Sequence, residues 1–195
     1  MLKEALDKRP ELQKFLFIRG FLVSDKRIES LTGFPFYNNW NEAQKDGYYF
    51  YVHNKTGVHF ASKGKVTLFL LGHCYDPFLM EIDEEKILAD ILNDYGTDKY
   101  YDRISEITGV YVTGAIENGQ IKFSVDPSGM QSACYGVIDD NFYLSSHPQL
   151  IGDICNLKMD DFVKELINYK WYGRVMGPYL PADMTPFTSV KRIVP

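Results

Sequence analysis

The chain has 195 residues, of which 45% are hydrophobic and 24% charged, and its net charge is −5 at pH 7. This composition is ordinary for a globular protein that buries a sizeable core. The negative charge argues against a nucleic-acid partner or an anionic membrane surface, because both are bound by clusters of Lys and Arg. Apolar runs stay far below the ~20 residues of a membrane helix, and the charged, amphipathic first segment is unlike a signal peptide. We expect neither nucleic acid nor membrane as a partner.

The cysteines Cys74, Cys134 and Cys155 are scattered along the chain without a Cys-x-x-Cys pair. An odd and sparse set is typical of reduced thiols, and it indicates neither a disulfide framework nor a zinc site. Free cysteines usually behave as small buried residues. We therefore expect a cytoplasmic protein whose cysteines serve packing.

The first quarter of the sequence predicts little regular structure after an initial helical segment. Residues 2–15 have helical spacing of apolar side chains, and Pro10 should divide this helix or delay its start. The run 17–23 predicts a buried strand. Residues 28–46 are rich in turn formers and aromatic side chains, so we expect a loop with at most a short helix.

A hairpin and a buried strand are expected next. The runs 48–53 and 57–62 flank Asn54-Lys55-Thr56, which predicts a hairpin turn. Residues 66–72 form a nearly continuous apolar run without alternation. This pattern predicts a strand that is buried on both faces.

Three helices are predicted in the rest of the chain. Residues 83–96 begin with acidic side chains and end at Gly96, which suits the dipole and the C-terminal cap of a helix. A shorter helix is expected over 99–107. Over 159–173, Asp160 or Asp161 can cap the start. The inward face of this last helix is predicted to contain Phe162, Val163, Leu166 and Ile167.

Two consecutive hairpins are the strongest local signals. The first spans 109–125 and turns at Asn118-Gly119, since both positions of such a turn need positive φ. The second spans 133–145 and turns at 139–141. Between them, 126–129 has proline at the second position of a β-turn. Runs of strands separated by runs of helices predict an α+β fold with two antiparallel sheets packed face to face and helices outside.

No catalytic motif is evident from the residues themselves. The sequence has no HExxH, no P-loop and no GxGxxG, so no metal, nucleotide or other cofactor is expected. His53 and His59 could face each other across a hairpin, but a surface pair is the simpler interpretation. Ser146 and His147 lack a nucleophile elbow and a third partner, so we interpret them as strand-end residues. The aromatic side chains of 34–40 and 48–51 suit sheet packing, with a ligand groove as the alternative.

Several segments nevertheless follow one another in a familiar order. They are FIRGF at 17–21, LLGHCYD at 70–76, GVYV at 109–112, DPSGM at 126–130, FYLSS at 142–146 and LPADMTPFTSVKRIVP at 180–195. In this order they resemble the N-terminal domain of asparagine synthase-like enzymes. That domain is a class II glutamine amidotransferase of the N-terminal nucleophile hydrolase fold. The resemblance covers about residues 15–195.

The resemblance implies a four-layer αββα sandwich over 15–195, preceded by a helical extension over 1–14. It also implies that catalysis has been lost. The family's N-terminal cysteine nucleophile corresponds to Leu16, which has no nucleophilic atom, and the glycine after it corresponds to Phe17. The Asn-Gly pair that stabilises the oxyanion corresponds to Leu71-Gly72, and the next Glu corresponds to His73.

The family's strand with the arginine that binds the substrate carboxylate is also missing. The stretch 48–51, which contains Tyr49, occupies its place. The resemblance therefore predicts no catalytic residue and a vacated pocket. The residues expected around this pocket are Leu16, Phe17, Tyr49, Leu71, Gly72 and His73. Residues 1–14 could cover its mouth.

We expect a catalytically inactive glutaminase-like domain of an ATP-dependent amide ligase. It would be retained as a structural or interaction domain for an ATP-pyrophosphatase (synthetase) domain, either in cis beyond Pro195 or in trans. The family's relatives with lost nucleophiles include β-lactam synthetases and lasso-peptide cyclases. A homodimer is a further possible assembly. One alternative is a small-molecule or peptide binding module that uses the vacated pocket, and another is a hydrolase that uses Cys74 or Ser24.

Overall fold

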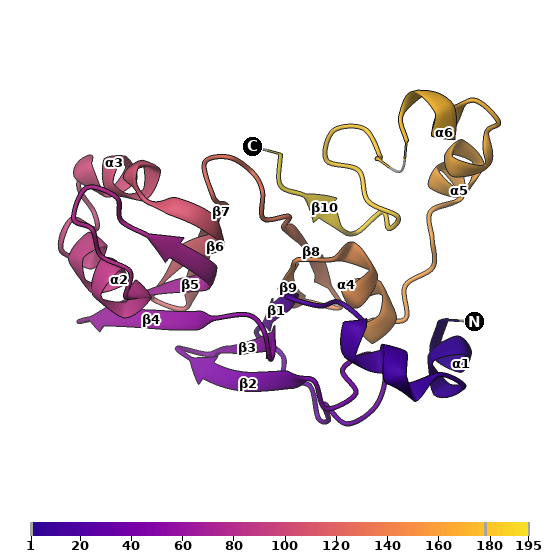
Figure 1. Cartoon of the computed structure of the whole chain (residues 1–195), viewed down its shortest axis with the longest axis horizontal. Helices are drawn as coiled ribbons and strands as arrows, with labels where there is room; N and C mark the ends of the chain where they lie inside the picture. Colours follow the sequence, from indigo (N-terminus) through magenta and orange to yellow (C-terminus); the bar gives the residue numbers. More distant parts are fainter. Residues whose placement is uncertain (1, 178, 195) are drawn as a thin grey trace.

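The computed structural model describes residues 2–177 and 179–194. Their strands form a six-stranded sheet, in the order β10-β8-β9-β1-β3-β2, and a four-stranded sheet, in the order β4-β5-β6-β7 (Figure 1). All strand pairs are antiparallel. The larger sheet contains β1 (Phe21–Ser24), β2 (Trp40–Lys45), β3 (Tyr48–His53), β8 (Cys134–Ile138), β9 (Asn141–Ser145) and β10 (Lys191–Arg192). The smaller sheet contains β4 (Val58–Lys63), β5 (Val66–Tyr75), β6 (Thr108–Glu117) and β7 (Gln120–Val125).

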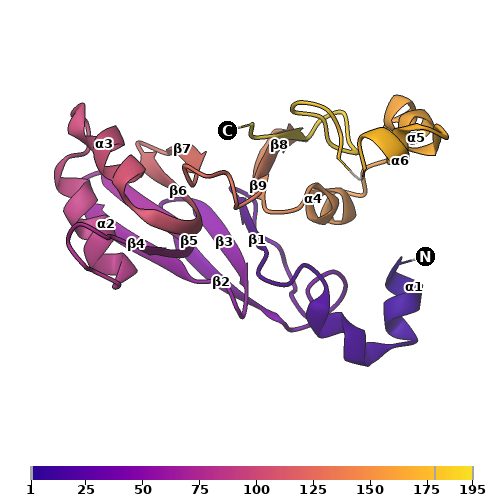
Figure 2. The same ribbon diagram turned by 45° about the horizontal axis from the view of Figure 1, so that its top comes forward.

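Helices lie around the two sheets, so the chain has the predicted α+β class with two antiparallel sheets. At one end of the molecule α2 and α3 lie on the smaller sheet, and at the other end α1, α5 and α6 extend away from the strands (Figures 1 and 2). The helices are α1 (Leu2–Asp7), the 3-10 helix η1 (Pro10–Phe15), α2 (Glu84–Asn93), α3 (Lys99–Glu106), α4 (Pro148–Ile154), α5 (Asp161–Asn168) and α6 (Tyr172–Val175). The break between α1 and η1 falls where Pro10 predicts it.

Three apolar clusters hold these elements together. The central cluster contains side chains from both sheets, such as Phe50 of β3, Phe69 of β5 and Leu144 of β9. A second cluster joins α2 and α3 to β5 and β6. A third lies on the other side of the larger sheet, where Leu150 and Ile151 of α4 pack. Burying one such side chain stabilises the fold by about 1.5–3 kcal/mol.

The strand β5 and the helix α2 follow the sequence prediction closely. Residues 67–72 of β5 are buried on both faces, as the unbroken apolar run predicts. Asp83 caps α2 by accepting hydrogen bonds from the backbone N–H groups of Glu85 and Lys86, and Gly96 beyond its end has a φ of +85°. The predicted apolar face of α2 is buried against the smaller sheet.

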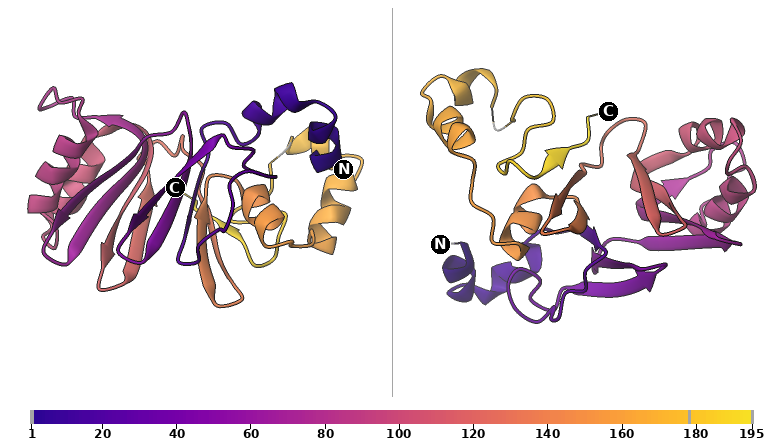
Figure 3. Two further views of the ribbon diagram at one scale, coloured as in Figure 1. Left: turned by 90° about the horizontal axis from the view of Figure 1, so that it is seen from below. Right: turned by 180° about the vertical axis from the view of Figure 1, so that it is seen from behind.

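Both predicted hairpins form, with two-residue turns. Asn118 and Gly119 have φ values of +51° and +77°, and Asp139 and Asp140 have φ values of +49° and +62°. These conformations match the twist of the strands they join. The hairpins do not lie in one sheet, however. The hairpin β6–β7 belongs to the smaller sheet and β8–β9 to the larger one, so the segment between them crosses from sheet to sheet (Figure 3).

The predicted strand over 17–23 is wrong at its start. β1 begins only at Phe21, because the preceding residues form tight turns: Phe17 and Arg19 have φ values of +50° and +59°, and the N–H of Gly20 donates to the carbonyl of Phe17. No glycine or asparagine stands at these two positions to reveal the left-handed backbone.

Two further predictions fail between β1 and β5. Residues 28–46 contain the edge strand β2 and no helix. The hairpin expected over 48–62 does not form, because β3 pairs with β1 and β2 whereas β4 pairs with β5. Residues 54–57 therefore connect the two sheets. His53 and His59 do not face each other across a hairpin, since they lie in different sheets.

The helix predicted over 159–173 ends early, at Asn168, and a short α6 follows. Asp160 caps α5 as expected. Of its predicted inward face, Val163 is buried, but Phe162 and Ile167 are exposed. In the described part of the chain, no helix combines the length and the apolar character that crossing a membrane requires.

Candidate functional site

A cavity of about 390 Å³ opens at the C-terminal end of β5. Side chains or backbone of Gly72, His73 and Cys74 form one wall, and the start of β6 forms another. The basic residues Arg19, from the turn before β1, and Lys55, from the connection between the sheets, also line it. The cavity is therefore formed by β5 and β6 of the smaller sheet together with connecting segments, and its basic lining favours an anionic ligand.

Two glycines shape this end of the smaller sheet. Gly72 has a φ of +119°, and a Cβ there would lie 2.3 Å from the carbonyl oxygen of Val110. Gly109, which faces Cys74 in the strand pair, has a φ of +151°, and its Cβ would lie 2.2 Å from the carbonyl oxygen of His73. Only residues without a side chain allow β5 and β6 to approach each other in this way.

Beside the cavity, three side chains from different elements converge: His59 of β4, His73 of β5 and Glu84 of α2. Nδ1 of His73 lies 3.3 Å from Oε1 of Glu84, and Nε2 of His59 lies 4.0 Å from Oε2 of the same carboxylate. The three ligand-type atoms all lie within 4.8 Å of one another. Imidazole nitrogen and carboxylate oxygen are metal ligands as well as ion-pair partners.

The imidazole of His59 is not satisfied by protein groups. Its Nε2 is buried and has no hydrogen-bond partner among the described residues. A buried polar atom left in this state costs about 1–3 kcal/mol. Gly57 leaves the ring its space, because a Cβ at position 57 would lie 2.5 Å from this nitrogen. The site thus retains an unpaired nitrogen beside a carboxylate.

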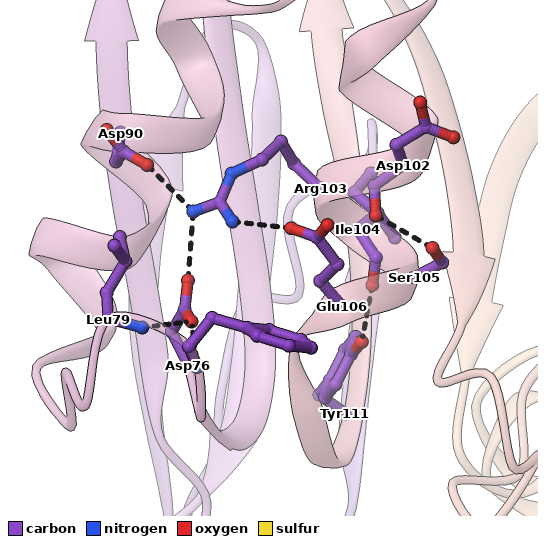
Figure 4. A network of polar contacts seen from close by, with 10 residues as sticks. Asp76, Leu79, Asp90, Asp102, Arg103, Ile104, Ser105, Glu106 and Tyr111 are labelled. Atoms are coloured by element: carbon purple, nitrogen blue, oxygen red, sulfur yellow. Dashed lines mark hydrogen bonds and ion pairs between the residues drawn. The ribbon is translucent and has the colours of Figure 1, made fainter.

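An ion-pair network centred on Arg103 joins the segment after β5 to α2 and α3 (Figure 4). Arg103 of α3 contacts Asp76, just after β5, at 2.9 Å, Asp90 of α2 at 2.8 Å and Glu106 at 2.7 Å. Asp76 also accepts hydrogen bonds from the backbone N–H groups of residues 78 and 79. Arg103 thereby ties α2 and α3 to the end of β5.

The environment of Asp76 favours its charged form. Burial by itself would raise the pKa of the Asp76 carboxyl, but the backbone N–H of Leu79, the Arg103 guanidinium and the backbone N–H of Phe78 outweigh it and hold the pKa below its ordinary value. The carboxylate is thus a permanent anion at neutral pH, and Arg103 is its counter-ion.

Cys74, the thiol at the cavity, is not activated. Burial, helped by the charges of Glu84 and Asp76, raises the pKa of Cys74 to about 12. At neutral pH the thiolate, which is the nucleophilic form, is then nearly absent. Ser24 is no better a candidate, because it is buried in β1 and its Oγ accepts the backbone N–H of Lys26 at 3.0 Å.

Residue 16, where the resemblance places the nucleophile, does not line the cavity, although Arg19 in the turn before β1 does. Leu16 lies at the end of η1, and neither it nor Phe17 lines the cavity. The Phe17 ring packs on His147 at 5.1 Å. Ser146 Oγ accepts the backbone N–H of Phe21 at 2.9 Å and lies 2.8 Å from Nδ1 of His147. These contacts agree with a strand-end role for Ser146 and His147.

The six residues expected around a vacated pocket are dispersed. Gly72 and His73 line the cavity. Leu71 is fully buried in the central cluster, and Tyr49 and Phe17 pack at the cluster on the outer side of the larger sheet. Residues 2–14 do not line the cavity either; Asp7 accepts a hydrogen bond from Tyr37 at 3.3 Å instead.

Two residues of the His/Glu cluster, His59 and Glu84, were not among the predicted site residues. The sequence offers no local signal for them, because positions 59, 73 and 84 follow no metal-binding spacing and meet only through the pairing of β4 with β5 and the packing of α2. Comparison of the sequence with models of protein families and with curated proteins finds no match.

Proposed function

We propose that the chain is a catalytically inactive domain of the class II glutamine amidotransferase type. Its sheets and outer helices would form the four-layer αββα sandwich of N-terminal nucleophile hydrolases. It would serve as a structural or interaction domain for an ATP-pyrophosphatase (synthetase) domain of an asparagine synthase-like amide ligase in the cytoplasm. That domain would follow Pro195 in cis or be a separate chain.

Two features of the fold support the proposed family. Strands of both sheets share the central apolar cluster, and helices pack on the outer side of each sheet. The strand β1, which the resemblance equates with the nucleophile strand, lies inside the larger sheet between β3 and β9. A central position is what a strand that once carried a catalytic terminus would need.

The proposed loss of glutaminase activity rests on the side chain and position of Leu16. Leu16, which the resemblance equates with the nucleophile, has an aliphatic side chain, and it lies at the end of η1 with its N–H donated to the carbonyl of Gln13. A glutaminase needs a nucleophile and a base at that point. The thiol at the cavity, Cys74, has a pKa of about 12 and does not replace it.

The region of α5 and α6 supports a role in protein interaction. Large apolar side chains are exposed over these helices and the segments beside them, and contiguous patches of this kind commonly mark protein–protein contacts. In Figure 1 the two helices extend away from both sheets. The exposed residues are Phe162, Ile167, Tyr169, Trp171, Val175, Met176 and Tyr179.

Ammonia release from glutamine tests the loss of activity. We expect the purified chain to release no more ammonia than buffer does. Release that disappears in Cys74→Ser or Ser24→Ala would overturn the proposal and establish a hydrolase.

Affinity isolation of the chain from its own cells, followed by mass spectrometry, tests the partner. We expect an ATP-pyrophosphatase domain, in the same polypeptide or in a bound one. Trp171→Asp should weaken binding of a separate chain, whereas Phe78→Asp, which changes an exposed aromatic residue between β5 and α2, should not. Isolation without any ATP-pyrophosphatase domain would contradict the interaction role.

A second candidate function is a small-molecule binding module, and the cavity at the end of β5 favours it. Its volume of about 390 Å³ and its basic residues Arg19 and Lys55 suit a small carboxylate ligand. A thermal-shift screen of amino acids, sugars and nucleotides tests this. A ligand that raises Tm for the native chain and loses its effect in Arg19→Ala would support the module; a screen without any stabilising compound would leave the structural role.

A further inference from the structure

We propose that His59, His73 and Glu84 form a Zn²⁺ site with an open coordination position beside the cavity at the end of β5. The proposal is independent of the amidotransferase resemblance, which assigns no metal to these residues. It begins from the convergence of two imidazoles and one carboxylate from β4, β5 and α2. Two His and one Glu make a three-ligand zinc set that leaves a fourth position free.

The distances suit a tetrahedral ion. With zinc–nitrogen and zinc–oxygen bonds of about 2.0–2.2 Å, neighbouring ligand atoms lie roughly 3.3–3.5 Å apart. His73 Nδ1 and Glu84 Oε1 are already 3.3 Å apart, and His59 Nε2 is 4.0 Å from Glu84 Oε2. Small side-chain rotations bring the third pair into range, because the three atoms lie within 4.8 Å of one another.

The unpaired nitrogen of His59 is the observation that an ion explains best. Its Nε2 is buried without a hydrogen-bond partner in the described chain, and 4.0 Å to the carboxylate is too long for a hydrogen bond. A bound Zn²⁺ would accept the lone pair of this nitrogen and occupy the space next to it. Gly57 keeps that space open, since a Cβ there would lie 2.5 Å from the nitrogen.

The surrounding charge also favours a cation. Glu84 is the first residue of α2, where the helix dipole is positive, but Asp83 and Glu85 add two carboxylates to the same turn. Lys86 of the same helix lies 3.5 Å from Asp83 and 3.8 Å from Glu81, so its charge is paired with those residues. The local balance around Glu84 stays negative.

Access to the site is one-sided. The side chains of His59 and Glu84 are only 22% and 18% exposed, whereas that of His73 is 70% exposed. His73 also lines the cavity, so a fourth ligand can approach from there. Water would occupy this position, and an anionic group held near Arg19 could replace it. Imidazole ligands select Zn²⁺ or a similar transition metal over Mg²⁺, which prefers oxygen.

Isothermal titration of the tag-free, EDTA-treated chain with ZnCl₂ tests the proposal. We expect one Zn²⁺ per chain and a rise in Tm on binding, with no response to MgCl₂. His59→Gln and Glu84→Gln should each weaken binding by about 100-fold or more, because even the loss of a group that only orients a zinc ligand costs about 10–100-fold. Glu85→Gln, one residue away in the same turn, is the matched control and should bind as the native chain does.

Several outcomes would overturn the site. One is the absence of binding below about 100 µM, a concentration that a three-ligand zinc site should not need. Equal affinity of Glu84→Gln and the native chain is another. Loss of binding in Cys74→Ser with retention in Glu84→Gln would place the metal on thiols instead.

If a variant fails to fold, the absorption spectrum of Co²⁺ bound to the native chain decides between the two ligand sets. The d–d bands of a four-coordinate N/O site support the proposed ligands, and thiolate charge-transfer bands contradict them.

Discussion

The start of β1 and the end of β5 each hold two of the chain's four histidines, and the two regions differ in how those rings are satisfied. At the start of β1, His53 accepts the backbone N–H of Lys55 at 3.2 Å through Nδ1, and His147 Nδ1 lies 2.8 Å from Ser146 Oγ. At the end of β5, Nε2 of His59 has no partner among the described residues. Nδ1 of His73 there lies 3.3 Å from Oε1 of Glu84.

The difference between the two regions indicates which of them can bind a ligand. Around the start of β1, both histidine rings have a hydrogen-bonding neighbour at Nδ1, although Trp40, whose ring packs on His53 at 6.0 Å, keeps a buried Nε1 without a partner among the described residues. Around the end of β5, an unpaired nitrogen, a carboxylate and a cavity lie together, and the ion pair of Arg103 with the buried Asp76 ties the end of this strand to α3. A site that is supported but unsatisfied is ready for a ligand, whereas a satisfied one is structural.

Replacing Arg103 tests the support at the end of β5 and should have the largest effect. Arg103→Met leaves Asp76 buried without its counter-ion, so we expect the free energy of unfolding to fall by about 3–5 kcal/mol. Guanidinium unfolding measures this change. Lys122→Met removes the cation of an exposed pair with Glu117 and should cost less than about 1 kcal/mol. Equal losses of unfolding free energy in the two variants would show that the network around Arg103 stabilises the fold no more than an exposed ion pair does.

Adding a methyl group at Gly72 tests the shape of the same region. We expect Gly72→Ala to cost about 2–4 kcal/mol, because the backbone is strained for any side chain and Cβ would meet the Val110 carbonyl. Gly33→Ala is the control, since a Cβ there meets nothing within 4 Å. Thermal and denaturant unfolding measure both variants. A neutral Gly72→Ala would mean that β5 and β6 do not need this close approach.

A pH titration should show a lowered pKa for both histidines at the start of β1. Burial lowers the pKa of both His53 and His147. The unfolded chain binds a proton near pH 6.5 and these native rings do not, so the free energy of unfolding should fall as the pH drops below about 6.5. For each ring the slope stays under about 1.4 kcal/mol per pH unit. NMR midpoints of His53 and His147 at or above 6.5 would contradict the buried, satisfied state.

Placing a thiol at residue 16, which the resemblance equates with the family's nucleophile, should have the smallest effect. Leu16→Cys supplies the sulfur, but residue 16 lies at the end of η1, outside the lining of the cavity, and its amine is not a free terminus. We expect no ammonia release from glutamine above buffer and a change in stability below about 1 kcal/mol. Glutaminase activity in this variant would show that the start of β1 still has the geometry for catalysis.

Local chemistry made part of this structure predictable. Asn118-Gly119 fixed one turn, Asp83 and Gly96 bounded α2, and the unbroken apolar run of β5 indicated burial on both faces. The α+β class follows from the order of such elements. These features depend on residues close together in the sequence, and the structure confirms them.

What depended on distant contacts could not be read from the sequence. Residues 54–57 look like a hairpin turn, yet they carry the chain from one sheet to the other. The turn at Phe17 and Arg19 replaces strand without a glycine to signal it. His59 and Glu84 belong to no motif, and only the folded sheet and helix bring them to His73. The strand β2 was hidden because most of it is exposed at an edge.

The most direct test of the difference between the two regions is an NMR spectrum of the histidine ring nitrogens during titration with ZnCl₂. All four rings report in one experiment. We predict that the signals of His59 and His73 shift and saturate at one equivalent of Zn²⁺, while those of His53 and His147 stay unchanged. Shifts of His53 or His147, or four unchanged rings, would contradict the claim that the end of β5 is the binding region and the start of β1 a structural one.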